Sequence, residues 1–159
     1  MAQITEKYIT EGVLKIDSLT EESLEKISEA HVLAQEVLVG YILSSAIEYE
    51  NDSLLDYMIY YFNIFSEAMA MQGVKMKKID ETIIDDFQEE YVQTLDEYME
   101  TEDQDLIGSL CNQPMMLSFL IHEISGEDET GETMEEELAD HVFIVGIALI
   151  ALMNRAIID

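Results

Sequence analysis

The sequence predicts an all-α protein, a single-domain bundle of about five helices with a short N-terminal arm. Three observations predict this class: apolar residues recur at helical spacing, the connections between such stretches are short, and no series of strand-like segments occurs. The chain has 159 residues, of which 48% are hydrophobic and 26% charged, as in one globular domain. We therefore expect residues 1–159 to form one helical domain, divided into an arm (1–17) and a bundle (18–159).

Gly12 is the basis for predicting the N-terminal arm, and a capping signal is the basis for predicting the start of the first helix. Apolar residues lie on both sides of Gly12, which favours an irregular or hairpin-like arm. Ser18 and Glu21 have the spacing of a capping box, so a long helix is expected from Ser18 to about Glu50. Its core-facing stripe follows steps of three and four residues: Leu24, Ile27, His31, Ala34, Leu38 and Tyr41.

The second and third helices have clear ends. The second is expected over 54–72, where Gly73 provides a natural stop, and it is apolar over most of its circumference. Such a helix is typical of the centre of a bundle or of an oligomer interface. The third is expected over 81–100, with Asp80 as its cap and with one apolar stripe facing the core.

The C-terminal third contains two further helical elements. One covers about 106–125 and is interrupted by Pro114, which predicts either a kink or two short helices. The last is expected over 134–157, after the capping-box pair Thr133 and Glu136. It is apolar on nearly every side, so we expect it either at the centre of the bundle or in a homodimer contact.

The start of the chain and its most apolar segment bear on localisation. No basic stretch followed by an apolar run occurs in residues 1–15, so no secretory signal is predicted there. The most apolar segment, Val142–Met153, is too short to span a bilayer. We expect a cytoplasmic protein in which Cys111, the single cysteine, is a reduced and structural thiol.

The charge of the chain restricts its partners. The chain carries 35 acidic and 7 basic residues, for a net charge of −28. Between Lys78 and Arg155 lie 76 residues without any lysine or arginine, and 21 of them are acidic. Such a field repels nucleic acids and anionic membranes, which bind through cationic contacts, and it attracts basic proteins. We therefore expect that the protein does not bind DNA, RNA or lipid headgroups directly.

The acidic side of the third helix is the most specific feature. Rows at i, i+4 rise by about 6 Å on a helix, close to the separation of successive phosphates along a nucleic-acid strand. These carboxylates are our candidate partner-binding residues: Asp85, Asp86, Glu89, Glu90, Asp96, Glu97 and Glu100. We predict a non-catalytic module that binds a basic protein, as an inhibitor or neutraliser that mimics nucleic acid or as an acidic chaperone. A second acidic run, 127–140, is expected to contribute, and an ordinary solvated helix face is the competing interpretation.

Two alternatives come from other classes of protein. His31, His122 and His141 lie on different expected helices, and three imidazoles that meet in a bundle can bind a transition metal, in a binding protein or an enzyme. Their spacing does not favour this alternative, because no paired motif such as His-Glu-x-x-His or Glu-x-x-His occurs. No nucleophile motif or phosphate-binding loop occurs either, so we predict no catalytic residue and no cofactor. The second alternative is a structural subunit whose only activity is dimerisation.

Overall fold

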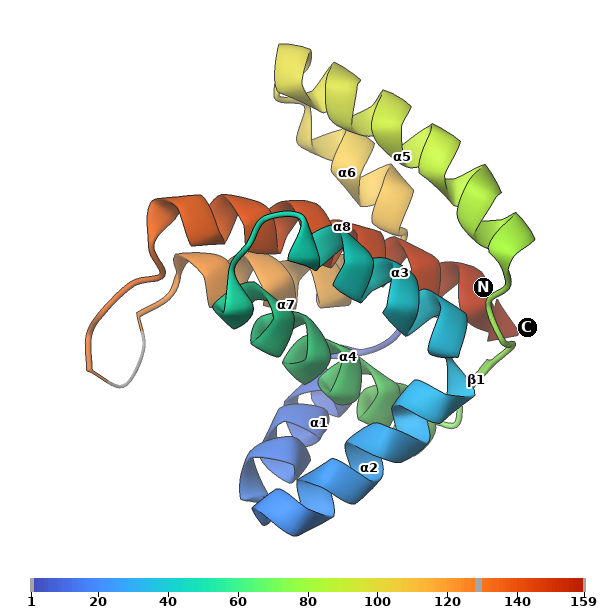
Figure 1. The fold of residues 1–159 in the computed structure, drawn as a ribbon, viewed down its shortest axis with the longest axis vertical. Coiled ribbons are helices and arrows are strands. Elements are labelled where there is room, and N and C mark those ends of the chain that lie inside the picture. The colour runs from blue at the N-terminus through green and yellow to red at the C-terminus, as the bar shows by residue number, and fades with distance from the viewer. Residues whose placement is uncertain (1, 128–129, 159) are drawn as a thin grey trace.

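The computed structural model describes residues 2–127 and 130–158, and helices dominate it (Figure 1). The all-α class is confirmed, but the expected number of about five helices is wrong, since the described residues form eight. They are α1 (Glu6–Ser18), α2 (Glu21–Ala34), α3 (Glu36–Ile47), α4 (Asp52–Gln72), α5 (Glu81–Thr101), α6 (Gln104–Cys111), α7 (Pro114–Ser125) and α8 (Glu136–Ala156). Two short strands, β1 (Lys75–Met76) and β2 (Ile157–Ile158), pair antiparallel, with Met76 opposite Ile157.

Helices α4 and α8 form the centre of the molecule. Every residue of the ranges 61–69 and 145–154 is buried, and α1, α3 and α7 pack around them. The prediction that these two helices are central is confirmed. Most of their apolar surface is covered within the chain, so its burial stabilises the core.

The N-terminal segment differs from its prediction. Residues 6–18 form a regular helix, α1, whose buried face of Ile9, Gly12 and Ile16 lies against α4. A Cβ atom added at Gly12 would lie 2.8 Å from the backbone oxygen of Ile64. Gly12 therefore permits the close approach of two helices, and the expected hairpin-like arm is wrong.

The expected long helix over 18–50 is also wrong, because the chain bends at Gln35. The N-cap of α2 is Thr20, whose side chain accepts a hydrogen bond from the Ser23 N–H. Between α2 and α3 the helix direction bends by 105°. The buried Gln35 amide donates to the Lys77 carbonyl at 2.8 Å and accepts from the Ile79 N–H at 3.0 Å. In the described residues no single helix is long and apolar enough to cross a membrane, and only α2 and α3 taken together pass that test, with their bend between them.

The other helices follow the sequence more closely. Helix α5 begins after Asp80, whose carboxylate accepts a hydrogen bond from the Ile83 N–H. Pro114 opens α7, so the interrupted element is two short helices. Helix α8 begins at Glu136, without a side-chain cap in place of the expected capping box.

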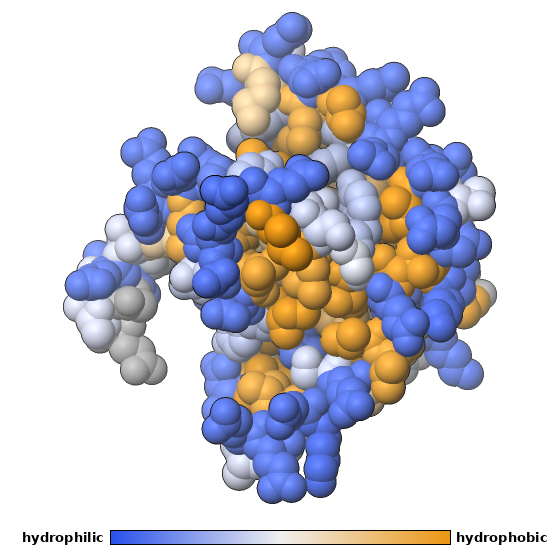
Figure 2. All heavy atoms as spheres, viewed as in Figure 1, coloured by the Kyte–Doolittle hydropathy of each residue, from blue (hydrophilic) through white to orange (hydrophobic). Residues whose placement is uncertain are grey.

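Helices α5 and α6 form a hairpin at one end of the molecule (Figure 1), and α6 packs against α8. The Tyr91 hydroxyl donates to the Ile144 carbonyl at 2.6 Å and so joins α5 to α8. Figure 2 shows mainly hydrophilic residues over α2 and α5, at the two ends of this face, with hydrophobic residues exposed between them.

Candidate functional site

The acidic face of α5 is exposed, as a binding surface requires. All seven candidate carboxylates are solvent-exposed. Glu90 forms an ion pair with Arg155, and the guanidinium of Arg155 lies 5.2 Å from the centre of the Phe87 ring. The other six, Asp85, Asp86, Glu89, Asp96, Glu97 and Glu100, pair with no lysine or arginine of residues 2–127 and 130–158. Six of the seven are therefore free to meet cations from outside the chain.

An apolar groove of about 640 Å³ runs beside this face. It is lined by residues of α5, α7 and α8, and it includes Met99 and Ile121, which are 63% and 41% exposed. Asp96 precedes Met99 by three residues on α5, and Asp140 of α8 lines the opposite wall. The groove therefore has carboxylates from both predicted acidic runs beside it. Residues 128 and 129 of the second run lie outside the described residues.

The three histidines lie in different surroundings. The His141 ring lines the groove and stacks on Tyr49, with ring centres 4.0 Å apart. The His31 Nε2 lies 2.7 Å from the Glu67 carboxylate, and His122 is exposed at the edge of a different pocket. Among the described residues no group of three or more histidine, cysteine or acidic side chains is arranged to hold a metal ion. The structure therefore does not bring the three imidazoles into one site.

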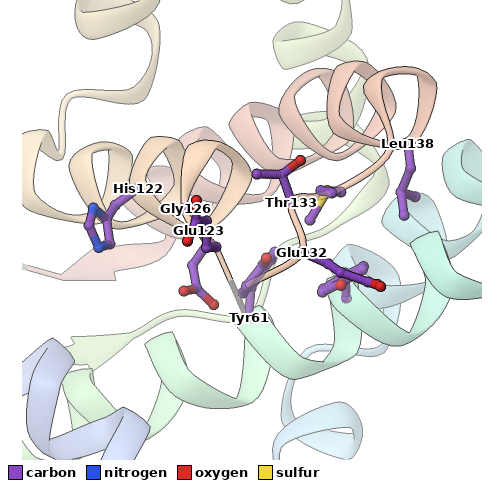
Figure 3. A pocket seen from close by; sticks show the side chains of 10 residues that line it. Tyr61, His122, Glu123, Gly126, Glu132, Thr133 and Leu138 are labelled. Carbon is purple, nitrogen blue, oxygen red and sulfur yellow. The ribbon is translucent and has the colours of Figure 1, made fainter. Parts of the chain in front are cut away.

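A second pocket, of about 240 Å³, lies between α4, α7 and the segment that leads into α8 (Figure 3). Tyr61 of α4 is fully buried, and its ring stacks on that of Tyr57 with centres 5.9 Å apart. Glu123 extends from α7 toward Tyr61, while Met134 and Leu138 add apolar surface. We call this the tyrosine pocket; its ten lining residues are Tyr57, Tyr61, His122, Glu123, Gly126, Glu127, Glu132, Thr133, Met134 and Leu138.

Burial raises the pKa values of two titratable groups in the tyrosine pocket, Glu123 and Tyr61. Burial raises the pKa of Glu123, and Asp17 raises it further, although His122 acts in the opposite direction. Burial and the charge of Glu123 together raise the pKa of Tyr61, which is therefore a neutral phenol at physiological pH. The Tyr61 hydroxyl is buried and has no hydrogen-bond partner among the described residues.

Cys111 has the environment that the sequence indicated. It is fully buried, its Sγ lies 3.6 Å from the Ile147 carbonyl oxygen, and burial raises its pKa to about 12. A thiol with such a pKa is not a nucleophile at neutral pH. The interpretation of Cys111 as a structural residue is therefore supported.

The tyrosine pocket was not predicted from the sequence. Tyr57 and Tyr61 are one turn apart, but they lie in a helix whose aromatic and aliphatic residues together indicated only burial. Comparison of the chain with protein-family models, curated proteins and solved structures finds no match. The function is therefore inferred from the acidic face, the groove and the pocket themselves.

Proposed function

We propose that this protein is a non-catalytic interaction module that binds a basic protein through the acidic face of α5 and the adjacent groove. The observation that carries the proposal is the set of six exposed and unpaired carboxylates on α5, together with an apolar groove along the C-terminal half of that helix that Asp140 of α8 also lines. A partner with lysine or arginine residues around an apolar segment matches both features. Such a partner buries its apolar side chains in the groove and places its cations on the rims.

The two features contribute differently to binding. The carboxylates attract a basic partner over a distance and accelerate association, an effect that salt screens. The groove, with Met99 and Ile121 at its surface, supplies apolar area that is removed from water on binding. Inhibition of a nucleic-acid-binding protein and protection of a basic client are both consistent with this arrangement. Both of these functions require binding to a basic protein through α5.

The test uses the purified protein as bait in nuclease-treated lysate of its source, with washes at low and then high salt. The triple variant Asp85→Lys, Glu89→Lys and Asp96→Lys is expected to lose a basic protein that the wild type retains at low salt. The matched control, Glu21→Lys, Glu25→Lys and Glu29→Lys on α2, changes the net charge equally and should retain it. Equal loss from both variants would show that net charge alone causes the capture, and would contradict a site on α5.

A variant in the groove distinguishes apolar docking in the groove from electrostatic attraction by the carboxylates of α5. Met99→Glu places a charge in the groove and leaves all the carboxylates of α5 in place. We expect it to weaken binding of the captured partner at least about tenfold at 150 mM salt, because a charge buried in an apolar contact is costly. Unchanged affinity would restrict the binding surface to the acidic face.

A further inference from the structure

The tyrosine pocket contains a hydroxyl without a hydrogen-bond partner and a carboxylate without a lysine or arginine partner among the described residues. The side chain of Tyr61 has no exposed surface, yet its hydroxyl has no hydrogen-bond partner. Glu123 is half-buried beside it, and among the described residues no lysine or arginine pairs with its carboxylate. A buried hydroxyl without a partner and a partly buried carboxylate without a cation both cost stability. A ligand that donates hydrogen bonds and carries positive charge would satisfy both groups at once.

The other walls of the pocket restrict the kind of cation. Met134 and Leu138 offer apolar contact, and the partly exposed ring of Tyr57 offers aromatic surface. A small metal ion would leave this apolar surface unused, and no metal-binding group of side chains occurs among the described residues. An organic cation uses both kinds of wall, because its carbon chain contacts the apolar residues while its charge lies near the carboxylate and the Tyr57 ring.

We propose that the tyrosine pocket binds a primary alkylammonium group, with its N–H groups donating to the Glu123 carboxylate and the Tyr61 hydroxyl oxygen. The carbon chain lies along Met134 and Leu138. A volume of about 240 Å³ accommodates such a group but not a folded segment of a protein. Two sources share this chemistry: a free aliphatic amine, and a lysine side chain of another protein. The inference does not depend on the α5 face, and either proposal can fail without the other.

Methyl-resolved NMR of the full chain tests the site directly. The methyl signals of Met134 and Leu138 are followed during titration with n-butylammonium chloride at constant ionic strength. We expect saturable shifts at these two residues, and no saturable shift with tetramethylammonium, which is a cation without N–H donors. A parallel titration with a lysine blocked at both termini identifies the source. Binding of both ligands admits a lysine side chain, and binding of butylammonium alone indicates a free amine.

Two nearly isosteric variants test the recognition of the ligand. Glu123→Gln removes the charge and should weaken butylammonium binding about tenfold, whereas Glu25→Gln on α2 is the control and should not. Tyr61→Phe removes only the hydroxyl, and it should weaken binding severalfold. Because that hydroxyl is unpaired in the free protein, the same variant should raise the Tm without amine by about 2–4 °C.

The combined result for Tyr61→Phe, a higher Tm and a lower affinity, is one that a purely structural role for the tyrosine does not produce. The proposal is overturned if butylammonium causes no saturable shift at Met134 and Leu138. It is equally overturned if tetramethylammonium binds as well, or if Glu123→Gln and Glu25→Gln have the same effect on binding. Each of these outcomes would leave the proposal for the α5 face unaffected.

Discussion

Glu67 of α4 and Glu123 of α7 are both withdrawn from solvent to some extent, and the fold treats them in opposite ways. Glu67 is 6% exposed and contacts two basic groups, the Lys15 ammonium at 2.5 Å and the His31 Nε2 at 2.7 Å. Glu123 is half-buried near Tyr61 and has no lysine or arginine partner among the described residues. In a chain with only 7 basic residues, the pairing of Lys15 with this buried carboxylate indicates that its charge must be neutralised for stability.

The pKa values of the two carboxylates express the same difference. Burial by itself would raise the pKa of Glu67, but the hydrogen bonds and charges of Lys15 and His31 outweigh it, and the pKa is lowered. Burial raises the pKa of Glu123, and the weaker influence of His122 does not compensate. Glu67 is thus a satisfied structural group, whereas Glu123 retains the capacity to bind a cation. This contrast distinguishes a structural acid from a candidate binding group.

The largest expected effect comes from Gly12, which allows α1 to approach α4 and lies one helical turn before Lys15. In Gly12→Ala the new methyl group would lie 2.8 Å from the backbone oxygen of Ile64, which cannot rotate away as a side chain could. We expect a loss of about 2–3 kcal/mol in the free energy of unfolding, a typical cost of overpacking between helices. Urea denaturation measures this loss directly.

The matched control for Gly12 is Gly40 of α3, where an added Cβ would meet no atom within 4 Å. Gly40→Ala should stabilise the protein by about 0.5–1 kcal/mol, because alanine has the higher helix propensity. Equal and small effects at both positions would contradict the close contact of α1 with α4.

A smaller loss is expected from Glu67→Gln, which keeps the shape of the side chain and removes its charge. The variant should lose about 2 kcal/mol, less than a fully buried ion pair would cost, because the Lys15 side chain is 45% exposed. The control is Glu22→Gln, since Glu22 forms only an exposed pair with Lys26 at 3.6 Å and should change stability by less than about 0.5 kcal/mol.

The same variant has a predicted pH signature. Because the pKa of folded Glu67 lies below its ordinary value of 4.5, its contribution is fully present above that value and is lost as the pH falls through the folded pKa. Wild-type protein should therefore lose more stability than Glu67→Gln between pH 5 and pH 3. Parallel losses in the two proteins would mean that Lys15 and His31 do not stabilise the charged form of Glu67.

The sequence predicted best those features that local residues determine. Asp80 marks the start of α5 and Gly73 the end of α4, because capping and left-handed backbone are local properties. It missed the bend at Gln35, because glutamine is a good helix former and the apolar stripe continues past it. The bend is held by hydrogen bonds to residues 77 and 79, and nothing local indicates contacts so distant along the chain.

In the candidate sites, too, the sequence predicted what local spacing determines and missed what tertiary contacts determine. The α5 face was found because helical spacing alone places its acids together, but the pairing of Glu90 with Arg155 is a tertiary contact that no local pattern reveals. Glu123 was one acid among many, and only the fold places it beside the buried hydroxyl of Tyr61. Gly12 was interpreted as a turn, because a glycine required for close packing and one required for a turn are identical in sequence.

The smallest expected effect, and the sharpest test of the comparison, is the response of Glu123→Gln to pH. Because the folded pKa of Glu123 is raised above its ordinary value of 4.5, the protonated form favours folding at low pH, and that contribution is lost as the pH rises through the folded value. At pH 7 the charged carboxylate therefore costs stability, and Glu123→Gln should raise the Tm by about 1–2 °C, a small gain because the group is only half-buried. Below about pH 4.5 the gain in Tm should disappear. Near neutral pH the two variants should differ in sign, since Glu123→Gln gains stability whereas Glu67→Gln loses it.

Thermal melts of both variants at pH 4 and pH 7 measure how the Tm of each depends on pH. A Glu123→Gln protein less stable than the wild type at pH 7 would mean that Glu123 already has a stabilising partner, and the contrast with Glu67 would fail.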